Sequence, residues 1–264
     1  KQIRGKSVST TAIPGLLPQN AEMSGKIYFK GVDLTSLTQK ELRNYRGQKI
    51  ALIFQEPGRS FDPLQNIGSV FFETFRVSEP DITKEESDKK AAKLLKDVGL
   101  PDSFGRLKAF PHQFSGGQLQ RIGIALALAQ NCELLIADEP TTALDVTIQA
   151  QVLALMNDLK NSREMSLILI THDFGIVARM CDKVAVMYAG QIVEYGTWDD
   201  MFLTKEHHPY TEGLLGAIPN INSREKRLHP IPGIVADNTV RREGCAFADR
   251  CSRATSICRI LSPK

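Results

Sequence analysis

Short apolar runs alternate along this chain with longer helix-like segments, and such alternation favours an α/β fold with a largely parallel sheet. The runs expected to form strands are KIYF (26–29), IALIF (50–54), LLIAD (134–138), SLILIT (166–171), VAVMY (184–188) and QIVEY (191–195). Several of them are apolar at consecutive positions, which is typical of strands covered on both faces. The periodicity predicts one helix over 84–98, with a capping box from Thr83 to Glu86, and another over 146–159.

The strand signals stop between about residues 58 and 113, so this stretch is expected to be a helical insertion within the α/β domain. After about Met201 proline and basic residues become more frequent, and we expect the chain to continue as a tail. The first residue is Lys1 rather than methionine, which suggests that the numbering starts inside a longer natural chain.

Composition narrows the class of protein. The 264 residues are 42% hydrophobic, which is enough for a buried core. A net charge of +3 is too small to indicate a nucleic-acid footprint. No apolar run approaches the roughly 18 residues that a membrane-spanning helix requires. Five cysteines are an odd number, and a secreted disulfide framework is not expected.

Two separate segments have the character of phosphate sites. GKS at Gly5 to Ser7 opens a helix-like segment and matches the end of a phosphate-binding loop, in which the lysine reaches the β and γ phosphates and the hydroxyl holds magnesium. Ile3 and Arg4 stand where small residues usually let backbone amides converge, so weak nucleotide binding stays open. SGGQ, from Ser115, begins a second helix and predicts another anion site.

Polar side chains follow the buried strands at the edge where α/β folds collect their ligands. Asp138 ends LLIAD and Glu139 follows it, at a place where burial of charge is costly unless a cation or a catalytic task compensates. Asp138 would face magnesium, and Glu139 would orient or deprotonate the attacking water. Gln55 after IALIF is a candidate ligand of magnesium or of that water, and His172 follows SLILIT. The alternatives are a solvated acidic turn, a strand-to-loop hydrogen bond and a structural histidine.

The order of these motifs resembles that in the nucleotide-binding subunit of ATP-binding-cassette (ABC) transporters: GKS, Gln55, SGGQ, LLIADEP (134–140), TALD (142–145) and His172. The resemblance extends over roughly residues 5–197. It implies an α/β P-loop NTPase of the ABC type, with a mainly parallel sheet core, a helical subdomain and a C-terminal extension. The implied domains are a nucleotide-binding domain at 1–200, whose helical subdomain spans about 58–130, and an extension at 201–264.

The same resemblance implies an ATPase that uses ATP and Mg²⁺. Its catalytic residues would be Glu139, His172 and Gln55, and Ser7, Gln55 and Asp138 would hold the magnesium ion. The residues implied to bind ATP are Gly5, Lys6, Ser7, Val8, Gln55, Ser115, Gly116, Gly117, Gln118, Asp138 and Asp145.

Two phosphate sites in one chain are accounted for by the family's dimer. The GKS site and the SGGQ helix of ABC proteins act on one ATP from opposite subunits of a head-to-tail dimer. The partner ATPase would be an identical chain or a paralogue. Asp145 and its neighbours are expected at the dimer interface, and the loop after Gln55, with the helical insertion, is expected to meet a membrane partner.

The second half of the chain resembles one branch of the family. HPYTEGLLGAIP (208–219), IPG (231–233) and GCAFADRCSRATSIC (244–258) look like the C-terminal extension of ATPase subunits of bacterial oligopeptide and dipeptide importers. This implies transmembrane permease subunits as partners, a peptide-binding protein indirectly, no nucleic acid, and a peripheral location at the cytoplasmic face of the inner membrane. The alternatives are an importer ATPase for nickel or another small solute, a non-transport ABC ATPase and a non-catalytic nucleotide clamp.

Three closely spaced cysteines, Cys245, Cys251 and Cys258, suggest a soft metal centre, and the resemblance implies a [4Fe-4S] cluster. Such a cluster usually needs four thiolates, and no fourth cysteine follows before Lys264. The alternative is three reduced cysteines that pack a small tail.

Overall fold

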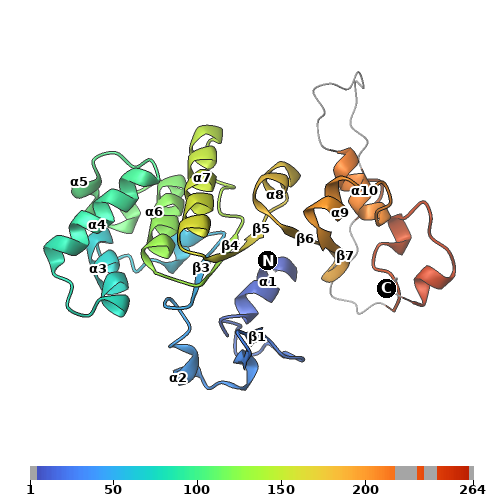
Figure 1. Ribbon diagram of the computed structural model, residues 1–264, viewed down its shortest axis with the longest axis horizontal. Helices are drawn as coiled ribbons and strands as arrows, with labels where there is room; N and C mark the ends of the chain where they lie inside the picture. Colours follow the sequence, from blue (N-terminus) through green and yellow to red (C-terminus); the bar gives the residue numbers. More distant parts are fainter. Residues whose placement is uncertain (1–4, 218–230, 235–242, 262–264) are drawn as a thin grey trace. The chain divides into compact units, whose positions relative to one another are not determined.

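The computed structural model describes residues 5–217, 231–234 and 243–261. The chain forms two compact units: residues 1–8 with 171–264 make the first, and residues 9–170 make the second. Figure 1 labels most of the helices and strands of both units, and each unit is described by itself.

A parallel sheet forms the centre of the second unit. Strand β4 (Leu134–Asp138) lies between β3 (Ile50–Ile53) and β5 (Ser166–Ile170), with Ala137 opposite Ile53 and Asp138 opposite Ile170. Every residue of β4 is buried, which explains its consecutive apolar positions. The sequence predicted these strands correctly, although β3 and β5 each end one residue earlier than expected.

Residues 57–129 of the second unit form a layer of helices. Helices α3 (Ile67–Ser78), α4 (Lys84–Asp97) and α5 (Ser103–Leu107) pack together, with short 3₁₀ helices at Pro57–Ser60 and Pro111–Gln113 (Figure 1). The described residues of the stretch 58–113 contain no strand, as predicted. The Thr83–Glu86 capping box is present, so the start of α4 was readable from local sequence.

Helix α6 (Gly116–Ala129) contacts both α4 and β3, so it joins the helical layer to the sheet. Its residues Ile122 and Ile124 are completely buried. Helix α7 (Val146–Ser162) runs three residues beyond the predicted end and buries Val152 and Met156.

A small hairpin completes the second unit. Strand β1 (Tyr28–Phe29) pairs antiparallel with β2 (Val32–Asp33), and a 3₁₀ helix (Leu34–Ser36) and helix α2 (Gln39–Leu42) follow. Leu34 and Leu42 of these elements pack with Ile50 and Ile136 of the sheet. The predicted strand 26–29 is therefore shorter than expected, and its partner β2 was not foreseen.

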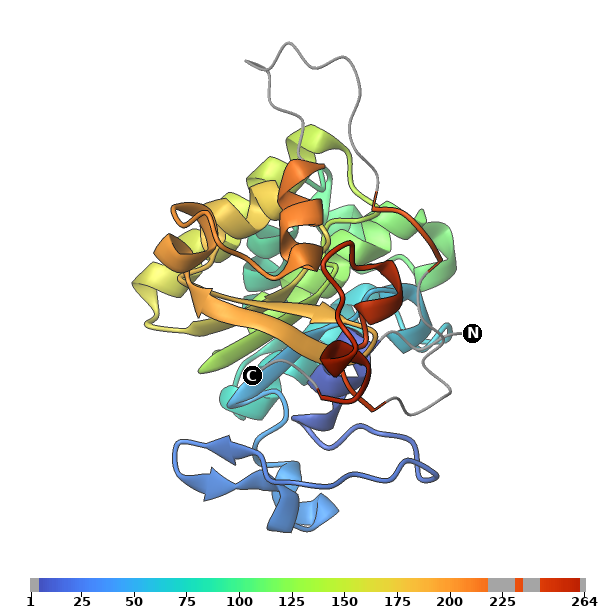
Figure 2. The ribbon, with the colours of Figure 1, turned by 90° about the vertical axis from the view of Figure 1, so that its right-hand side faces the viewer.

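The first unit is built on an antiparallel ribbon of β6 (Lys183–Tyr188) and β7 (Gln191–Thr197). Ala189 and Gly190 both have positive φ, of 47° and 84°, which suits the two-residue turn that connects the strands. Helix α8 (Phe174–Met180) precedes the ribbon, and α9 (Trp198–Phe202) and α10 (Pro209–Gly216) follow it (Figure 2). The start of α1 (Gly5–Ala12) also belongs to this unit.

Directly after Met201 the chain forms regular structure, which the expected tail did not include. Tyr210 and Leu214 of α10 pack against Val184 and Val186 of the ribbon. A composition shift toward proline and basic residues therefore marks a change of environment here, and not the end of regular structure.

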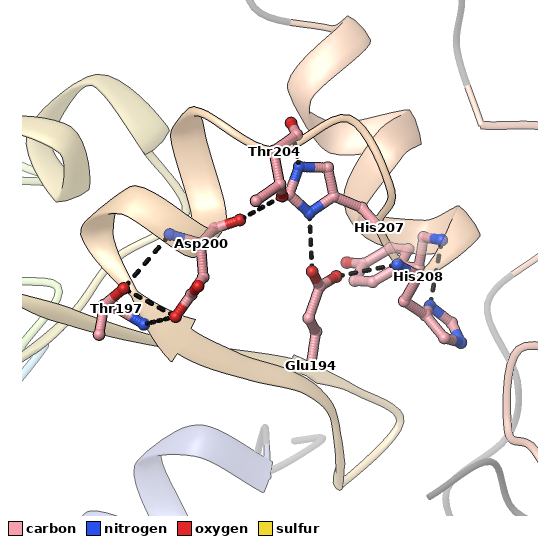
Figure 3. Close-up of polar contacts among 7 residues, drawn as sticks. Glu194, Thr197, Asp200, Thr204, His207 and His208 are labelled. Carbon is pink, nitrogen blue, oxygen red and sulfur yellow. Dashed lines mark hydrogen bonds and ion pairs between the residues drawn. The ribbon is translucent and has the colours of Figure 1, made fainter.

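Glu194 of β7 fixes the connection between α9 and α10 (Figure 3). Its Oε1 lies 2.7 Å from Nδ1 of His207, and its Oε2 accepts a 3.0 Å hydrogen bond from the backbone N–H of His208. Thr197 and Asp200 form a capping box at the start of α9. One carboxylate thus attaches the whole connection to the ribbon.

No helix in the described part of the chain is both long enough and apolar enough to traverse a lipid bilayer.

Candidate functional site

The GKS segment lies at the start of α1, as the sequence predicted. Gly5, Lys6, Ser7 and Val8 form the first turn of the helix, and the positive end of a helix dipole favours an anion. A Cβ atom at Gly5 would lie 3.0 Å from Cα of Gly190, so glycine lets this turn approach the β6–β7 connection. Ile3 and Arg4 lie outside the described residues.

The lysine of this segment contacts the chain that follows β5. Nζ of Lys6 donates a 3.4 Å hydrogen bond to the carbonyl of Thr171. His172 is the next residue and is exposed, and Asp173 caps α8 by accepting from Gly175 N and Ile176 N. The first unit therefore brings Lys6 next to the residue that precedes His172.

The second unit brings the predicted carboxylates to the edge of its sheet. Asp138 is the last residue of β4 and Glu139 follows it, and both are only 7% exposed. Gln55 lies two residues beyond the end of β3, at the same edge. Its Nε2 donates a 3.3 Å hydrogen bond to Oε2 of Glu139. Two polar residues that are far apart in sequence thus meet, as parallel strands predict.

Glu139 has an unusual backbone and a second side-chain donor. Its φ of 45° lies in the left-handed region, which is uncommon for a residue with a side chain and frequent at functional sites. Its N–H donates to the carbonyl of Ile170 at 2.9 Å. Oγ1 of Thr142 donates to Oε2 of Glu139 at 3.0 Å. The sequence did not single out this hydroxyl.

The SGGQ segment starts α6 with a capping box. The Ser115 hydroxyl accepts from the Gln118 N–H at 3.3 Å, and the Gln118 side chain accepts from the Ser115 N–H at 3.0 Å. A Cβ atom at Gly116 would meet no atom within 4 Å, whereas one at Gly117 would lie 2.9 Å from the carbonyl oxygen of Ala143. Gly116 is thus open to an approaching group, and Gly117 lets α6 pack on the loop after Glu139.

Gln120 is a site residue that the sequence analysis missed. It is 2% exposed, and its Nε2 donates a 2.9 Å hydrogen bond to the carbonyl of Pro140, the residue after Glu139. The available signal was a polar residue in helical phase with Ile124 and Ala127, which are buried. Helix α6 therefore contacts the Glu139–Asp145 loop through both Gln120 and Gly117.

Asp145 caps the next helix, α7. Its Oδ1 accepts a 3.0 Å hydrogen bond from the Ile148 N–H, and the side chain is exposed. The adjacent Val146 is 83% exposed, which leaves an apolar side chain in water at the start of α7. An exposed acidic cap beside an exposed valine is compatible with an interface at this position.

The three C-terminal cysteines lie in the first unit. Cys245 and Cys251 pack with Tyr188 and Phe247, and Sγ of Cys245 lies 3.7 Å from Nε2 of His208. Thr255 hydrogen-bonds the Cys258 thiol and lowers its pKa. Within the described ranges, no group of three or more His, Cys, Asp or Glu side chains could hold a metal ion. The thiols are therefore not gathered into a cluster site.

A cleft of about 570 Å³ lies elsewhere on the second unit. It is bounded by the segment before β3, by α3 and by the residues after α6. Its lining includes Arg46, Gln48, Glu73, Val77 and Gln130.

Comparisons with known proteins agree with this architecture. Residues 4–142 match the family model described as ABC transporter, and residues 193–258 match that of the oligopeptide/dipeptide transporter C-terminal region. The chain is 50% identical over 256 residues to the oligopeptide transport ATP-binding protein of Bacillus subtilis (strain 168), covering 96% of this chain and 71% of that protein. It is 44% identical over 260 residues to the dipeptide transport ATP-binding protein of Escherichia coli (strain K12), covering 98% and 79%.

Solved structures of ATP-binding cassettes also resemble this chain. The dimeric structure of a post-hydrolysis state of an ATP-binding cassette, bound to ADP and Pi, superposes with a TM-score of 0.66 at 26% identity. That likeness covers 74% of this chain and 81% of the other. A second dimeric structure, of a bacterial ABC transporter cassette, gives a TM-score of 0.63 at 27% identity.

Proposed function

The chain belongs to the ABC transporter family, and on that premise we propose that it binds and hydrolyses ATP to power the import of dipeptides and oligopeptides. The match of residues 193–258 to the oligopeptide/dipeptide C-terminal region favours peptides over nickel or another small solute. The relatives in Bacillus subtilis and Escherichia coli carry the names of oligopeptide and dipeptide transport ATP-binding proteins.

The observation that carries the catalytic proposal is the meeting of Gln55, Glu139 and Thr142 at one carboxylate. A buried glutamate at the end of a parallel strand is suited to accept a proton from water. In the proposed reaction the water oxygen forms a bond to the γ-phosphorus, and the bond to the β–γ bridging oxygen breaks. ADP and phosphate leave, and Glu139 takes the proton of the water.

The donor groups of the assigned residues are of the chemical types that a magnesium nucleotide requires. Lys6 and Ser7 lie in the first turn of α1, and Asp138 is a buried carboxylate whose oxygens are hard ligands. We assign Ser7, Gln55 and Asp138 to magnesium, which would neutralise charge on the phosphates. Lys6 is assigned to the β and γ phosphates, and His172 to the γ-phosphate side of the site.

A second subunit completes the proposed site. The SGGQ helix is assigned to the γ-phosphate of ATP held by the partner, in a head-to-tail dimer. The open space at Gly116 and the exposed Ser115 support this assignment, because a phosphate has room to approach. The matched cassettes are dimeric, and the exposed Asp145–Val146 corner is assigned to the same interface.

We assign the binding of the transport partners to the helical layer. The loop after Gln55 and the cleft between α3 and β3 would receive transmembrane permease subunits, at the cytoplasmic face of the inner membrane. A peptide-binding protein would act through that permease. In this scheme residues 1–200 are the nucleotide-binding domain, with a helical subdomain at about 58–130, and residues 201–264 are an extension.

An iron–sulfur centre would be a further feature of that extension. The side-chain arrangement of Cys245, Cys251 and Cys258 does not fit a cluster, since the first two thiols pack against aromatic rings. Anaerobic purification followed by iron analysis and visible absorption tests the point directly. A stoichiometric iron content together with visible absorption would establish the cluster.

The experiment for the proposed function uses the full-length protein. Glu139→Gln should stop ATP turnover but preserve an ATP-dependent dimer, because the amide keeps the shape of the carboxylate and cannot take the proton. Ser115→Arg should abolish ATP-driven dimerisation in light scattering and leave ATP binding to the monomer intact. Normal turnover by the Glu139 variant would refute its role as the base.

A further inference from the structure

The carboxylate of Glu139 is held at one oxygen by donors from two sides. Oγ1 of Thr142 lies 3.0 Å from Oε2, and Nε2 of Gln55 lies 3.3 Å from the same atom. The carboxylate is buried, and hydrogen bonds to a charged group are about twice as strong as neutral ones. These two side chains therefore restrict the direction in which the carboxylate points.

The two donors reach Glu139 by different routes. Gln55 comes from the end of another strand, whereas Thr142 follows Glu139 by three residues in a tight turn. The Thr142 N–H donates to the Glu139 carbonyl at 3.4 Å, and the left-handed backbone of Glu139 closes that turn. The same turn thus delivers both the carboxylate and the hydroxyl that orients it.

We propose that Thr142 is a positioning residue for Glu139, and that its hydroxyl holds the carboxylate in the orientation needed to accept the proton of the attacking water. This inference rests on the proposed function. Thr142 touches neither nucleotide nor water in this scheme, and it acts only through Glu139.

The matched variants are Thr142→Val, which removes the hydroxyl at nearly constant volume, and Thr142→Ser, which keeps it. Thr142 is exposed, so neither change should unfold the protein. We expect Thr142→Val in the full-length protein to lower kcat for ATP about ten-fold, with KM for ATP and ATP-dependent dimerisation unchanged. Thr142→Ser should keep kcat within about two-fold, and Thr204→Val, at an exposed position after α9 and outside the assigned sites, serves as a control.

If the role of Thr142 were purely structural, both Thr142 variants would have an equally lowered kcat, or ATP binding would weaken. Either result would overturn the proposal. An unchanged or raised kcat of Thr142→Val would overturn it as well. In a Glu139→Gln background the Thr142→Val change should have no further effect on residual turnover. If Glu139→Gln is inactive and Thr142→Val is normal, only the positioning role fails. If Glu139→Gln turns over normally, the proposed function of Glu139 fails first.

Discussion

The hydrogen bond from Gln120 to Pro140 predicts a measurable loss of stability on substitution. Gln120→Met keeps the length and volume of the side chain and removes its amide donor. Because the position is 2% exposed, water does not replace the missing donor without rearrangement, and the Pro140 carbonyl loses a 2.9 Å contact. A buried carbonyl that has lost its hydrogen-bond donor lowers the free energy of unfolding by about 1–3 kcal/mol. Burial of the apolar methionine side chain offsets part of this loss.

We therefore expect a net destabilisation of about 1–2 kcal/mol. For a chain of this size each kcal/mol lowers the melting temperature by about 2–4 °C, so the midpoint should fall by about 2–8 °C. Thermal unfolding followed by far-ultraviolet circular dichroism measures the shift. Gln151→Met is the matched control, because Gln151 is exposed on α7 and its substitution should change stability by less than about 0.5 kcal/mol.

Two results would refute the reasoning. A Gln120→Met midpoint within about 1 °C of the wild type would mean that the Pro140 carbonyl does not depend on this amide. An equal fall in the Gln151→Met control would mean that the loss is not specific to the buried bond. Removal of bound nucleotide before the scans is necessary, because a ligand of the folded state raises the midpoint by itself.

The remaining predictions concern thiols, pH and glycines. Iodoacetamide should modify Cys258 first and Cys132 last in peptide mass spectrometry, because hydrogen bonds from a neighbouring threonine lower the pKa of Cys258 and burial raises the pKa of Cys132. Burial lowers the pKa of His208 from 6.5 against the opposing effect of two glutamates, so the unfolded chain binds that proton more tightly. Urea stability, read from the single tryptophan, should therefore fall as pH drops below about 6.5, and His208→Asn should flatten this dependence. Gly117→Ala should destabilise by about 1–3 kcal/mol, since its Cβ would lie 2.9 Å from a carbonyl oxygen, whereas Gly116→Ala should leave monomer stability unchanged and weaken ATP-driven dimerisation.

The sequence predicted the sheet of the second unit because its signals are local. Strand β4 is apolar at consecutive positions and is buried throughout, and the start of α4 has a capping box in four residues. Pairing of β1 with β2 and the folding of α10 were not predictable in this way. Strands β1 and β2 have two residues each and are too short to show an alternating pattern, whereas α10 depends on contacts with residues that are distant in sequence, such as those of Tyr210 with the ribbon.

The same distinction applies to the candidate site. The meeting of Gln55 with Glu139 followed from the rule that parallel strands end at one edge of the sheet. The contact of Thr142 with Glu139 did not follow, because it requires a left-handed backbone at a glutamate, where sequence preference argues against one. The role of Gln120 depends on which loop packs against α6, and helical phase alone does not identify that loop.

These contacts connect two parts of the proposed ATP site within one polypeptide. Helix α6 begins with the residues assigned to the partner's nucleotide, and it touches the Glu139–Asp145 loop at Pro140 and Ala143. The same loop carries the carboxylate assigned to this chain's own nucleotide. Packed groups of this kind do not move independently, because the gap at Gly117 has no room even for a methyl group. Gln120 and Gly117 therefore link the position of α6 to that of the loop that holds Glu139.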